Sequence, residues 1–280
     1  MILSTASPVL APDGGLLLVV VALLLYVLAA LPLSALQRFS AAALLGGWML
    51  HGALLVIDIA GIGLPQPGAR LGFAPVLSIT VWLVIAVYAV ESRFAPLLTV
   101  RRGLAVAGAL AVGVMAAFPG EMRPITSSWA PLHFVLGVSA YGLFGAAVLH
   151  ALLLDAAERR LRAGGPAGRL QALGPSAMGM PLLQLERVTF HFVEAGFAVL
   201  TATLVLGVVN TVQWHWDHKA VFSLLAWAVF AALLLGRRAR GWRGRRATLW
   251  LYAGAVLLLL GYAGSRFVVE VMLARGPAAS

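Results

Sequence analysis

The residues best suited to chemistry gather in one short segment, WHWDHK, at positions 214–219. It sets Trp214, His215, Trp216, Asp217, His218 and Lys219 together in a chain that is 61% hydrophobic and 11% charged. Imidazole and carboxylate groups ligate zinc or copper. Indole rings stack on flat molecules or settle at a membrane interface, and an ammonium group binds carboxylates. Three interpretations follow: a metal site, an interfacial aromatic belt, or a site for a planar amphiphile whose iron a histidine ligates.

Other ionisable residues lie inside apolar runs, where a titratable side chain is costly and therefore marks a candidate site. His51 and Asp58 are seven residues apart, a spacing that puts them on one face of a helix. His51 is either a structural histidine bonded to a neighbouring helix or a ligand. His191 and Glu194 are three residues apart and also share a face. They are either a structural pair or a ligand with the carboxylate that orients it.

A further histidine, His133, opens the apolar run WAPLHFVLGVSAYG. Gly137 and Gly142 follow it, and small residues let another helix or a flat ligand come close. His150 lies seventeen residues further along the same run, ~25 Å away at the rise of a helix. The two histidines therefore cannot share one ligand, and we expect His150 at the membrane interface.

Helices in lipid must position these residues, because a mean hydropathy of +0.96 is too high for a soluble domain. Runs of about 20 apolar residues span a bilayer as helices. Such runs are predicted at 15–34, 41–60, 73–90, 102–118, 129–153, 188–210, 220–236 and 246–265. We predict an all-α fold, a polytopic membrane helix bundle of about eight transmembrane helices in one integral membrane domain, 1–280. Residues 154–187 are predicted to be a cytoplasmic connector with a short helix.

Positive charge is shared unevenly between the loops. Fifteen of the 20 lysine and arginine residues fall at alternate loops, starting with Arg38, and five at the others. Because basic loops stay in the cytoplasm, both termini and the WHWDHK segment are predicted on the non-cytoplasmic side. The net charge of +10 then reflects loop topology and not nucleic-acid binding. The most basic loop, RRARGWRGRR at 237–246, is expected to meet anionic lipid.

Several classes of function are disfavoured by what the sequence lacks. It has no cysteine, which excludes disulfides, thiolate metal sites and covalent haem capture by the chain's own thiols. It has no hydrolase elbow, phosphate loop or metalloprotease motif, so we do not expect an enzyme. It has no inverted repeat, which argues against a transporter whose path His51, Asp58, His191 and Glu194 would line. The first apolar run lacks a basic leader and a cleavage site, so we expect a spanning helix and not a signal peptide.

An ordered series of motifs from residue 129 onward carries a family resemblance. The segments are WAPLHFVLGVSAYG, LERVTFHFVEAGFAVLTATLVLG, WHWDHKAVFSLLAWAVFAALLLGRRARGWRGRRA and GYAGSRFVVEVML. Over residues 129–275 the chain resembles the haem-handling membrane proteins of cytochrome c assembly, the CcsA, CcmC and HemX-like family. It is most similar to the short HemX-like or YpjD-like inner-membrane proteins. The first 128 residues resemble the family only in having spans.

The resemblance implies a function and a set of site residues. In the family, two histidines flank the tryptophan-rich external loop and hold non-covalent, b-type haem there. His133 matches the first histidine, and Trp214, Trp216, Asp217 and Lys219 match the motif. The segment FVVEVMLARG lacks the second histidine. His215 or His218 replaces that ligand, or the iron is five-coordinate, or the haem has been lost.

The implied protein is a multi-pass component of a bacterial-type inner membrane that presents haem on its outer side. Its implied partners are haem, apocytochrome and other cytochrome c maturation proteins. The alternatives are a regulatory or interaction protein without haem, as HemX-like relatives suggest, and then a transporter of small solutes.

Overall fold

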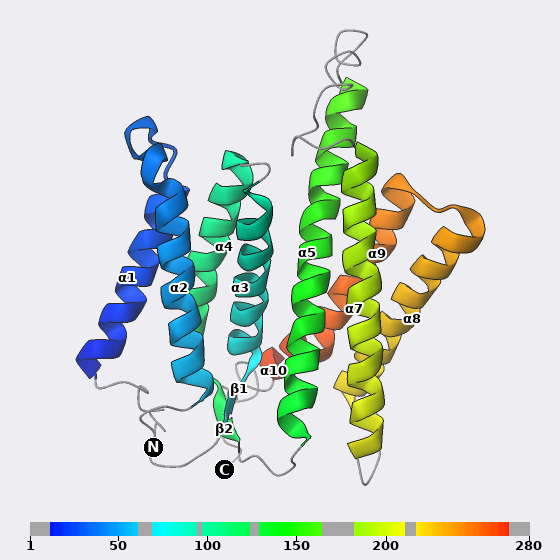
Figure 1. The fold of residues 1–280 in the computed structure, drawn as a ribbon. Coiled ribbons are helices and arrows are strands. Elements are labelled where there is room, and N and C mark those ends of the chain that lie inside the picture. The colour runs from blue at the N-terminus through cyan, green and yellow to red at the C-terminus, as the bar shows by residue number, and fades with distance from the viewer. Residues whose placement is uncertain are drawn as a thin grey trace. The chain divides into compact units, whose positions relative to one another are not determined.

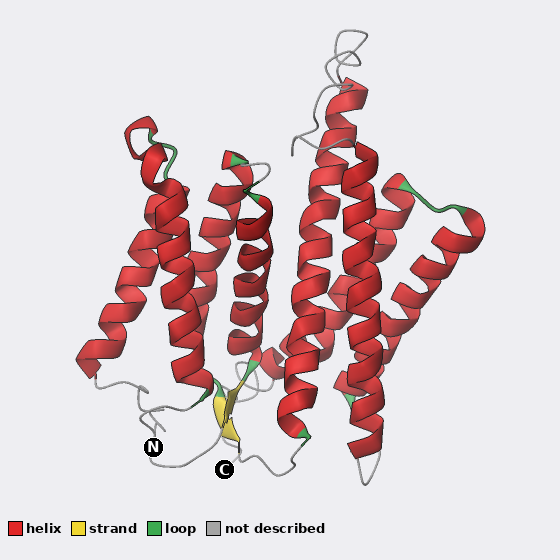
Figure 2. Cartoon of the chain, viewed as in Figure 1, coloured by secondary structure: helices red, strands yellow, loops and turns green. Residues whose placement is uncertain are grey.

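The computed structural model describes residues 12–60, 69–93, 97–123, 129–163, 182–210 and 217–268 (Figure 1). Helices make up nearly all of this described chain (Figure 2). Seven helices within it are long and apolar enough to cross a membrane, and a shorter apolar helix covers Gly15–Ala30. Lipid offers no water to backbone N–H and C=O groups, so each apolar run satisfies them internally as a helix. The predicted polytopic helix bundle is confirmed.

The described elements fall into two compact units. The first contains α1 (Pro12–Ala30), the 3-10 helix η1 (Ser34–Phe39), α2 (Ser40–Ile59), most of α3 (Phe73–Glu91) and α4 (Leu98–Ala117). It also contains the strands β1 (Ala69–Leu71) and β2 (Glu121–Arg123), paired antiparallel with Ala69 opposite Arg123. These strands were not predicted, because three residues are too few to show an alternating pattern.

The second unit contains α5 (Ala130–Ala163), α7 (Leu182–Asn210), α8 (His218–Arg240), α9 (Gly244–Leu259) and the π-helical turn η2 (Leu260–Gly264). The short helix α10 (Ser265–Phe267) follows η2. Within this unit α5 and α7 run antiparallel and lie side by side (Figure 1).

A chain of buried polar side chains joins α1, α2 and α3 in the first unit. The Tyr26 hydroxyl lies 3.0 Å from His51 Nδ1, and His51 Nε2 lies 2.7 Å from Ser78 Oγ. All three side chains are fully buried. A buried polar group without a partner is costly, so the three residues stabilise one another. Gly108 leaves room for the Tyr26 ring, since a Cβ there would lie 2.6 Å from it.

Two tryptophans clasp α2 to α3. Trp48 Nε1 donates to the Trp82 carbonyl at 3.0 Å, and Trp82 Nε1 donates to the Trp48 carbonyl at 2.9 Å. The two indoles are stacked, with centroids 4.8 Å apart and planes 7° from parallel. These carbonyls belong to helices, so each accepts the indole N–H through its second lone pair.

Aromatic rings and glycines pack the core of the second unit. Phe144 and Phe230 stack at 3.8 Å between centroids. Phe144 lies against Gly196, where a Cβ would come within 3.2 Å of the ring. Phe230 lies against Gly254, where a Cβ would come within 2.6 Å. Small residues at these contacts let neighbouring helix backbones approach while each ring fills the gap.

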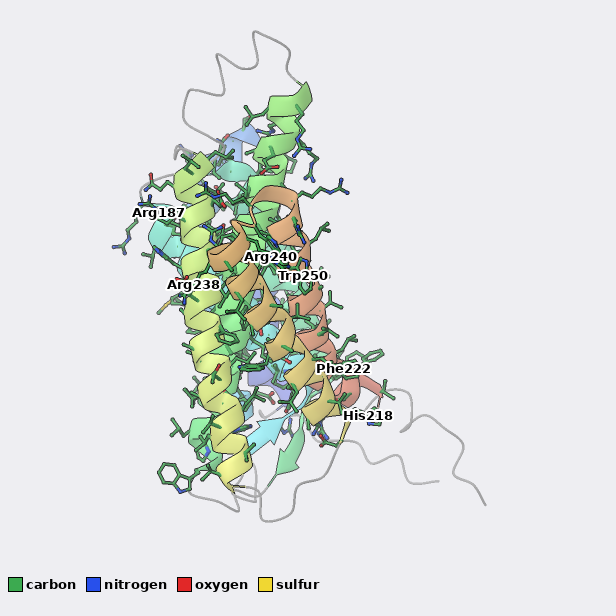
Figure 3. All side chains as sticks on the ribbon, turned by 90° about the vertical axis from the view of Figure 1, so that its right-hand side faces the viewer. Arg187, His218, Phe222, Arg238, Arg240 and Trp250 are labelled. Atoms are coloured by element: carbon green, nitrogen blue, oxygen red, sulfur yellow. The ribbon has the colours of Figure 1, made fainter. Side chains whose placement is uncertain are left out.

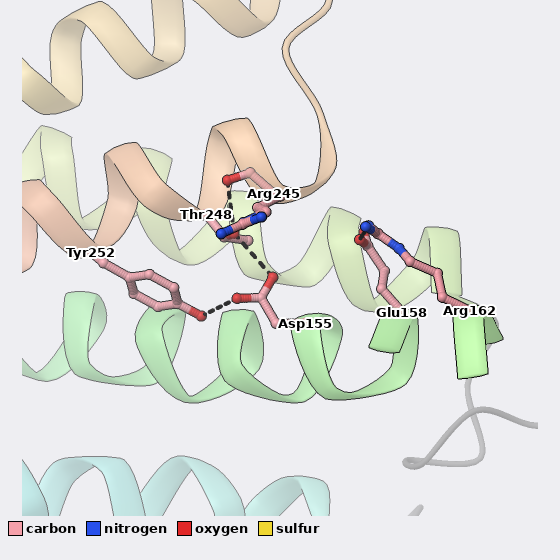
Figure 4. Close-up of polar contacts among 6 residues, drawn as sticks. All are labelled: Asp155, Glu158, Arg162, Arg245, Thr248 and Tyr252. Carbon is pink, nitrogen blue, oxygen red and sulfur yellow. Dashed lines mark hydrogen bonds and ion pairs between the residues drawn. The ribbon is translucent and has the colours of Figure 1, made fainter. Parts of the chain in front are cut away.

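The helices α5 and α7 extend into the predicted connector 154–187 from its two ends. α5 runs on to Ala163, and α7 begins at Leu182. In the extended part of α5, Arg162 pairs with Glu158 four residues earlier at 2.8 Å, and Asp155 accepts from Thr248 at 3.0 Å and Tyr252 at 2.9 Å (Figure 4). These partners hold the helix beyond the apolar run. Residues 164–181 of the predicted connector lie outside the described residues.

One carboxylate, that of Glu186, forms ion pairs at the end of the second unit that carries Arg237–Arg246. Glu186 accepts from Arg237 at 2.8 Å and lies 3.5 Å from Arg243. The Arg237 guanidinium also sits 3.7 Å from the centroid of the Phe190 ring. Gly241 ends α8 with a φ of 64°, a conformation that glycine adopts without the strain of a Cβ. We call this part of the second unit the arginine-rich end.

Candidate functional site

A cavity of about 520 Å³ lies at the opposite end of the second unit, where α5 begins, α7 ends and α8 begins. Its volume is within the range of about 300–1,000 Å³ that is typical of small-molecule sites. The lining residues with polar side chains are His133, Tyr141, Thr203, Asp217, Lys219, Ser223 and Tyr262. Three glycines and five aliphatic residues complete the wall: Gly137, Gly207, Gly261, Leu200, Leu204, Val208, Ala220 and Leu258.

His133 lies in the first turn of α5, and Gly137 and Tyr141 of the same helix also line the cavity. The His133 side chain is exposed, and its backbone N–H donates to the Trp129 carbonyl at 3.0 Å. Its imidazole edge lies against Gly207 on α7, where a Cβ would be 3.2 Å from His133 Cε1. An accessible imidazole on a helical wall is a suitable axial ligand for a metal in the cavity.

Asp217 and Lys219 enter the cavity from the start of α8. Asp217 is the N-cap of α8, with an extended backbone at φ −85° and ψ 164°, and its carboxylate accepts from the Ala220 N–H at 2.8 Å. This cap satisfies a backbone donor that the first turn of a helix leaves unpaired. The Lys219 ammonium lies 5.7 Å from the centroid of the Tyr262 ring, within the range of a cation–π interaction.

A π-helical turn forms the remaining wall. In η2 the backbone departs from the α-helical pattern, and the Tyr141 hydroxyl donates to the Leu258 carbonyl just before it. Gly261 and Tyr262 of this turn line the cavity. Single π turns inside helices often mark functional sites. A Cβ at Gly261 would lie 3.2 Å from Ser223 Oγ, so this glycine lets α8 approach the turn.

The tertiary structure thus brings together three residues that the sequence singled out. His133 is eighty-four residues from Asp217 in the chain, yet it lines the same cavity as Asp217 and Lys219. His218 begins α8, is exposed, and is not among the residues lining this cavity. Trp214, His215 and Trp216 lie outside the described residues.

Sequence reasoning missed several cavity residues. Tyr141 and Tyr262 lie inside the segments WAPLHFVLGVSAYG and GYAGSRFVVEVML, but neither tyrosine was singled out. Thr203, Gly207 and Ser223 had no distinguishing signal, because threonine, glycine and serine are common in spanning helices.

The other predicted ligands have partners of their own. His51 belongs to the first unit, where Tyr26 and Ser78 engage both of its ring nitrogens. Asp58 pairs with Arg70 in the same unit, 3.4 Å away. The side chains proposed to line a transport path therefore divide between two units, since His191 and Glu194 belong to the second.

The structural pair that was one interpretation of His191 and Glu194 is not seen, because the carboxylate of Glu194 pairs with another residue. Glu194 lies 3.6 Å from Arg238 of α8, and His191 is exposed on α7. The guanidinium of an arginine is always charged and carries five N–H donors, so Arg238 is a strong partner for this carboxylate. Among the described residues, no group of three histidine, aspartate or glutamate side chains could hold a metal ion.

His150, which was expected at the membrane interface, is fully buried among the helices. Its Nδ1 donates to the Ala146 carbonyl at 2.8 Å, and its Nε2 lies 3.1 Å from Glu91 Oε2. The Phe192 ring lies beside it, with the ring centroids 5.2 Å apart. Burial follows because α5 continues past this position, so that α7 still covers it.

The family model described as "Cytochrome C assembly protein" matches residues 14–273. The chain belongs to this family. The match reaches well upstream of residue 129, so the cytochrome c assembly resemblance extends to the first unit, where the motifs had shown only spans.

Individual relatives within this family are similar over part of their length. The inner membrane protein YpjD of Escherichia coli is 35% identical over 144 residues, which are 50% of this chain and 52% of the relative. The cytochrome c biogenesis protein CcsA of Parasynechococcus marenigrum is 31% identical over 160 residues, again 50% and 52%. The chain therefore spans about half the length of the curated relatives it matches. No solved structure matches the chain.

Proposed function

We propose that this member of the cytochrome c assembly family binds haem non-covalently in the cavity of the second unit and passes it on in cytochrome c biogenesis. The observation that carries the proposal is the convergence of His133 with Asp217 and Lys219 around one cavity. The relative CcsA is a cytochrome c biogenesis protein. Haem would supply a planar macrocycle, an iron atom that takes axial ligands, and two carboxylates.

The cavity residues fit such a ligand. The accessible imidazole of His133 suits the iron, and the Lys219 ammonium suits a carboxylate. The Tyr262 ring and the aliphatic wall suit the macrocycle. Because the chain has no cysteine, binding is non-covalent, and release requires only exchange of the axial ligand. We propose a carrier and not an enzyme.

The location and partners follow from the same reasoning. As in the inner membrane protein YpjD, we propose an inner membrane for this multi-pass chain. A carrier of haem in cytochrome c biogenesis must deliver it to apocytochrome or to another maturation protein. The exposed Trp129 beside the cavity end offers an aromatic contact for such a partner.

The arginine-rich end supports a contact with anionic lipid. Arg187, Arg238 and Arg240 are exposed there, and Arg238 is 76% exposed (Figure 3). Each basic residue near an anionic surface contributes about 1 kcal/mol. Replacing these three arginines with glutamine should lower the amount of phosphatidylglycerol that co-purifies with the protein, without changing haem binding at the opposite end.

The experiment that tests the proposed function is an absorption spectrum of the detergent-purified protein with a pyridine haemochrome assay. We expect a Soret band in the wild type and its loss in His133→Ala and in a Trp214→Ala/Trp216→Ala double variant. His191→Ala is the matched control, because it removes another exposed histidine, near the other end of the same unit.

The outcomes separate the alternatives. A Soret band that survives in His133→Ala would move the haem away from the cavity. A colourless wild type, even after haem is added, would favour the regulatory interpretation and a search for a protein partner at the arginine-rich end.

A further inference from the structure

Gly207 lies beside the His133 imidazole on the facing helix, four residues after Thr203, whose backbone is hydrogen-bonded to the same ring. A Cβ built on Gly207 would lie 3.2 Å from His133 Cε1 and 3.8 Å from His133 Nδ1. A distance of 3.2 Å is tighter than about nine in ten real Cβ contacts, so an added methyl would force the ring to move by a few tenths of an ångström. The hydrogen bond to Thr203 anchors the imidazole, and the missing Cβ of Gly207 leaves the space that this position of the ring requires.

The register of α5 against α7 shows that this contact belongs to a pattern. Gly137, four residues along α5 from His133, faces Thr203, four residues back along α7 from Gly207. Phe144, seven residues further along α5, faces Gly196, seven residues further back along α7. At each end of this series of contacts, an aromatic ring on α5 packs against a glycine on α7: His133 against Gly207, and Phe144 against Gly196. The His133 contact thus follows from the same antiparallel packing that seats Phe144 in the core.

We propose that Gly207 is a positioning residue: its backbone surface holds the imidazole of His133 at the cavity wall in the orientation needed to ligate a metal centre. The inference rests on the proposed function for the identity of that centre as haem iron. A ligand must be held within about 0.5 Å of its productive position, which is the scale of the displacement that a methyl at Gly207 imposes. Residues that orient a ligating histidine alter metal affinity by about 10–100-fold when replaced.

Gly207→Ala tests the inference, and Gly196→Ala is its matched control. Both replace a glycine of α7 with alanine, which raises helix propensity, so neither is expected to unfold the helix. Both also place the new methyl 3.2 Å from a ring of α5, but the ring at Gly196 is that of Phe144, and Gly196 does not line the cavity. The two variants therefore differ in whether the new methyl presses on His133.

The first measurement uses the apoprotein. In full-length protein labelled at histidine and studied in detergent, the His133 Cε1–H resonance is assigned by its loss in His133→Ala. We expect it to shift in Gly207→Ala and to stay in place in Gly196→Ala. An unmoved resonance in Gly207→Ala, or an equal shift in both variants, would overturn the inference whether or not the protein binds haem.

The second measurement is a haem titration followed at the Soret band. We expect affinity to fall about 10-fold or more in Gly207→Ala, with a changed spin-state spectrum, and to change less than about threefold in Gly196→Ala. In a His133→Ala background, Gly207→Ala should have no further effect, because the residue acts through the imidazole. An equal loss in that background would overturn the inference. If the wild type takes up no haem, the proposed function fails, and the resonance alone decides the role of Gly207.

Discussion

At the scale of single residues, Glu186 is the carboxylate on which the arginine-rich end depends. Its side chain is only 10% exposed and contacts both Arg237 and Arg243. Removing it would leave the Arg237 guanidinium beside the Phe190 ring without its counter-charge. Removing one partner of a fully buried pair costs about 3–5 kcal/mol, and partial exposure of the arginines reduces this.

We therefore expect Glu186→Ala to lower the free energy of unfolding in detergent by about 1–3 kcal/mol. Arg162→Ala is the control, because it also breaks an ion pair but its side chain is 69% exposed. Its loss should cost less than about 0.5 kcal/mol. Equal losses of unfolding free energy in the two variants would show that the ion pairs of Glu186 stabilise the protein no more than an exposed ion pair does.

The Trp48–Trp82 clasp makes a second prediction at this scale. Trp82→Phe removes the N–H that bonds the Trp48 carbonyl and part of the stacking area, so we expect a loss of about 1–2 kcal/mol of unfolding free energy. Trp48→Phe should cost about the same, because its contacts are reciprocal. The double variant should cost less than the two together, since each single change already breaks the shared stack. Strict additivity would mean that the indoles stabilise α2 and α3 independently.

At the scale of elements, glycines that seat aromatic rings set how closely the helices approach. Gly254→Ala would place a methyl 2.6 Å from Phe230, whose ring stacks on Phe144 of another helix. Overpacking of this kind typically costs about 1–3 kcal/mol. Gly137→Ala in the same unit meets only an ordinary contact, and we expect it to be neutral or to stabilise the protein by up to about 1 kcal/mol. Thermal unfolding of both variants in detergent compares the two effects, and equal losses would contradict the role of Gly254 as a ring seat.

At the scale of the whole molecule, the orientation predicted from loop charge can be tested directly, because the natural chain has no cysteine. We expect Leu132→Cys, at an exposed position near the start of α5, to react with a membrane-impermeant maleimide in intact spheroplasts. Arg240→Cys, at the exposed end of α8, should react only after the membrane is opened. The reverse pattern would place the cavity end of the second unit in the cytoplasm. It would contradict the presentation of haem on the non-cytoplasmic side.

The sequence by itself determined that the chain is a helical membrane protein and where most of its spans lie. Apolar runs of this length have one way to satisfy their backbone groups in lipid, which is local hydrogen bonding within a helix. The sequence also identified His133, Asp217 and Lys219 through ordered motifs. The helix of the fifth span runs on to Ala163, past the apolar run that predicted the span, because the charged turns around Asp155 and Glu158 are held by partners on other turns and helices.

The tertiary structure decided which residues meet. Helical periodicity shows which side chains share a face, but in lipid all apolar faces are alike, so close packing and polar partners select the face that meets a neighbour. Glu194 therefore pairs with Arg238 across helices and not with His191 on its own helix. For the same reason, only the antiparallel register of α5 and α7 sets His133 on Gly207, at the wall of a cavity that three other elements complete.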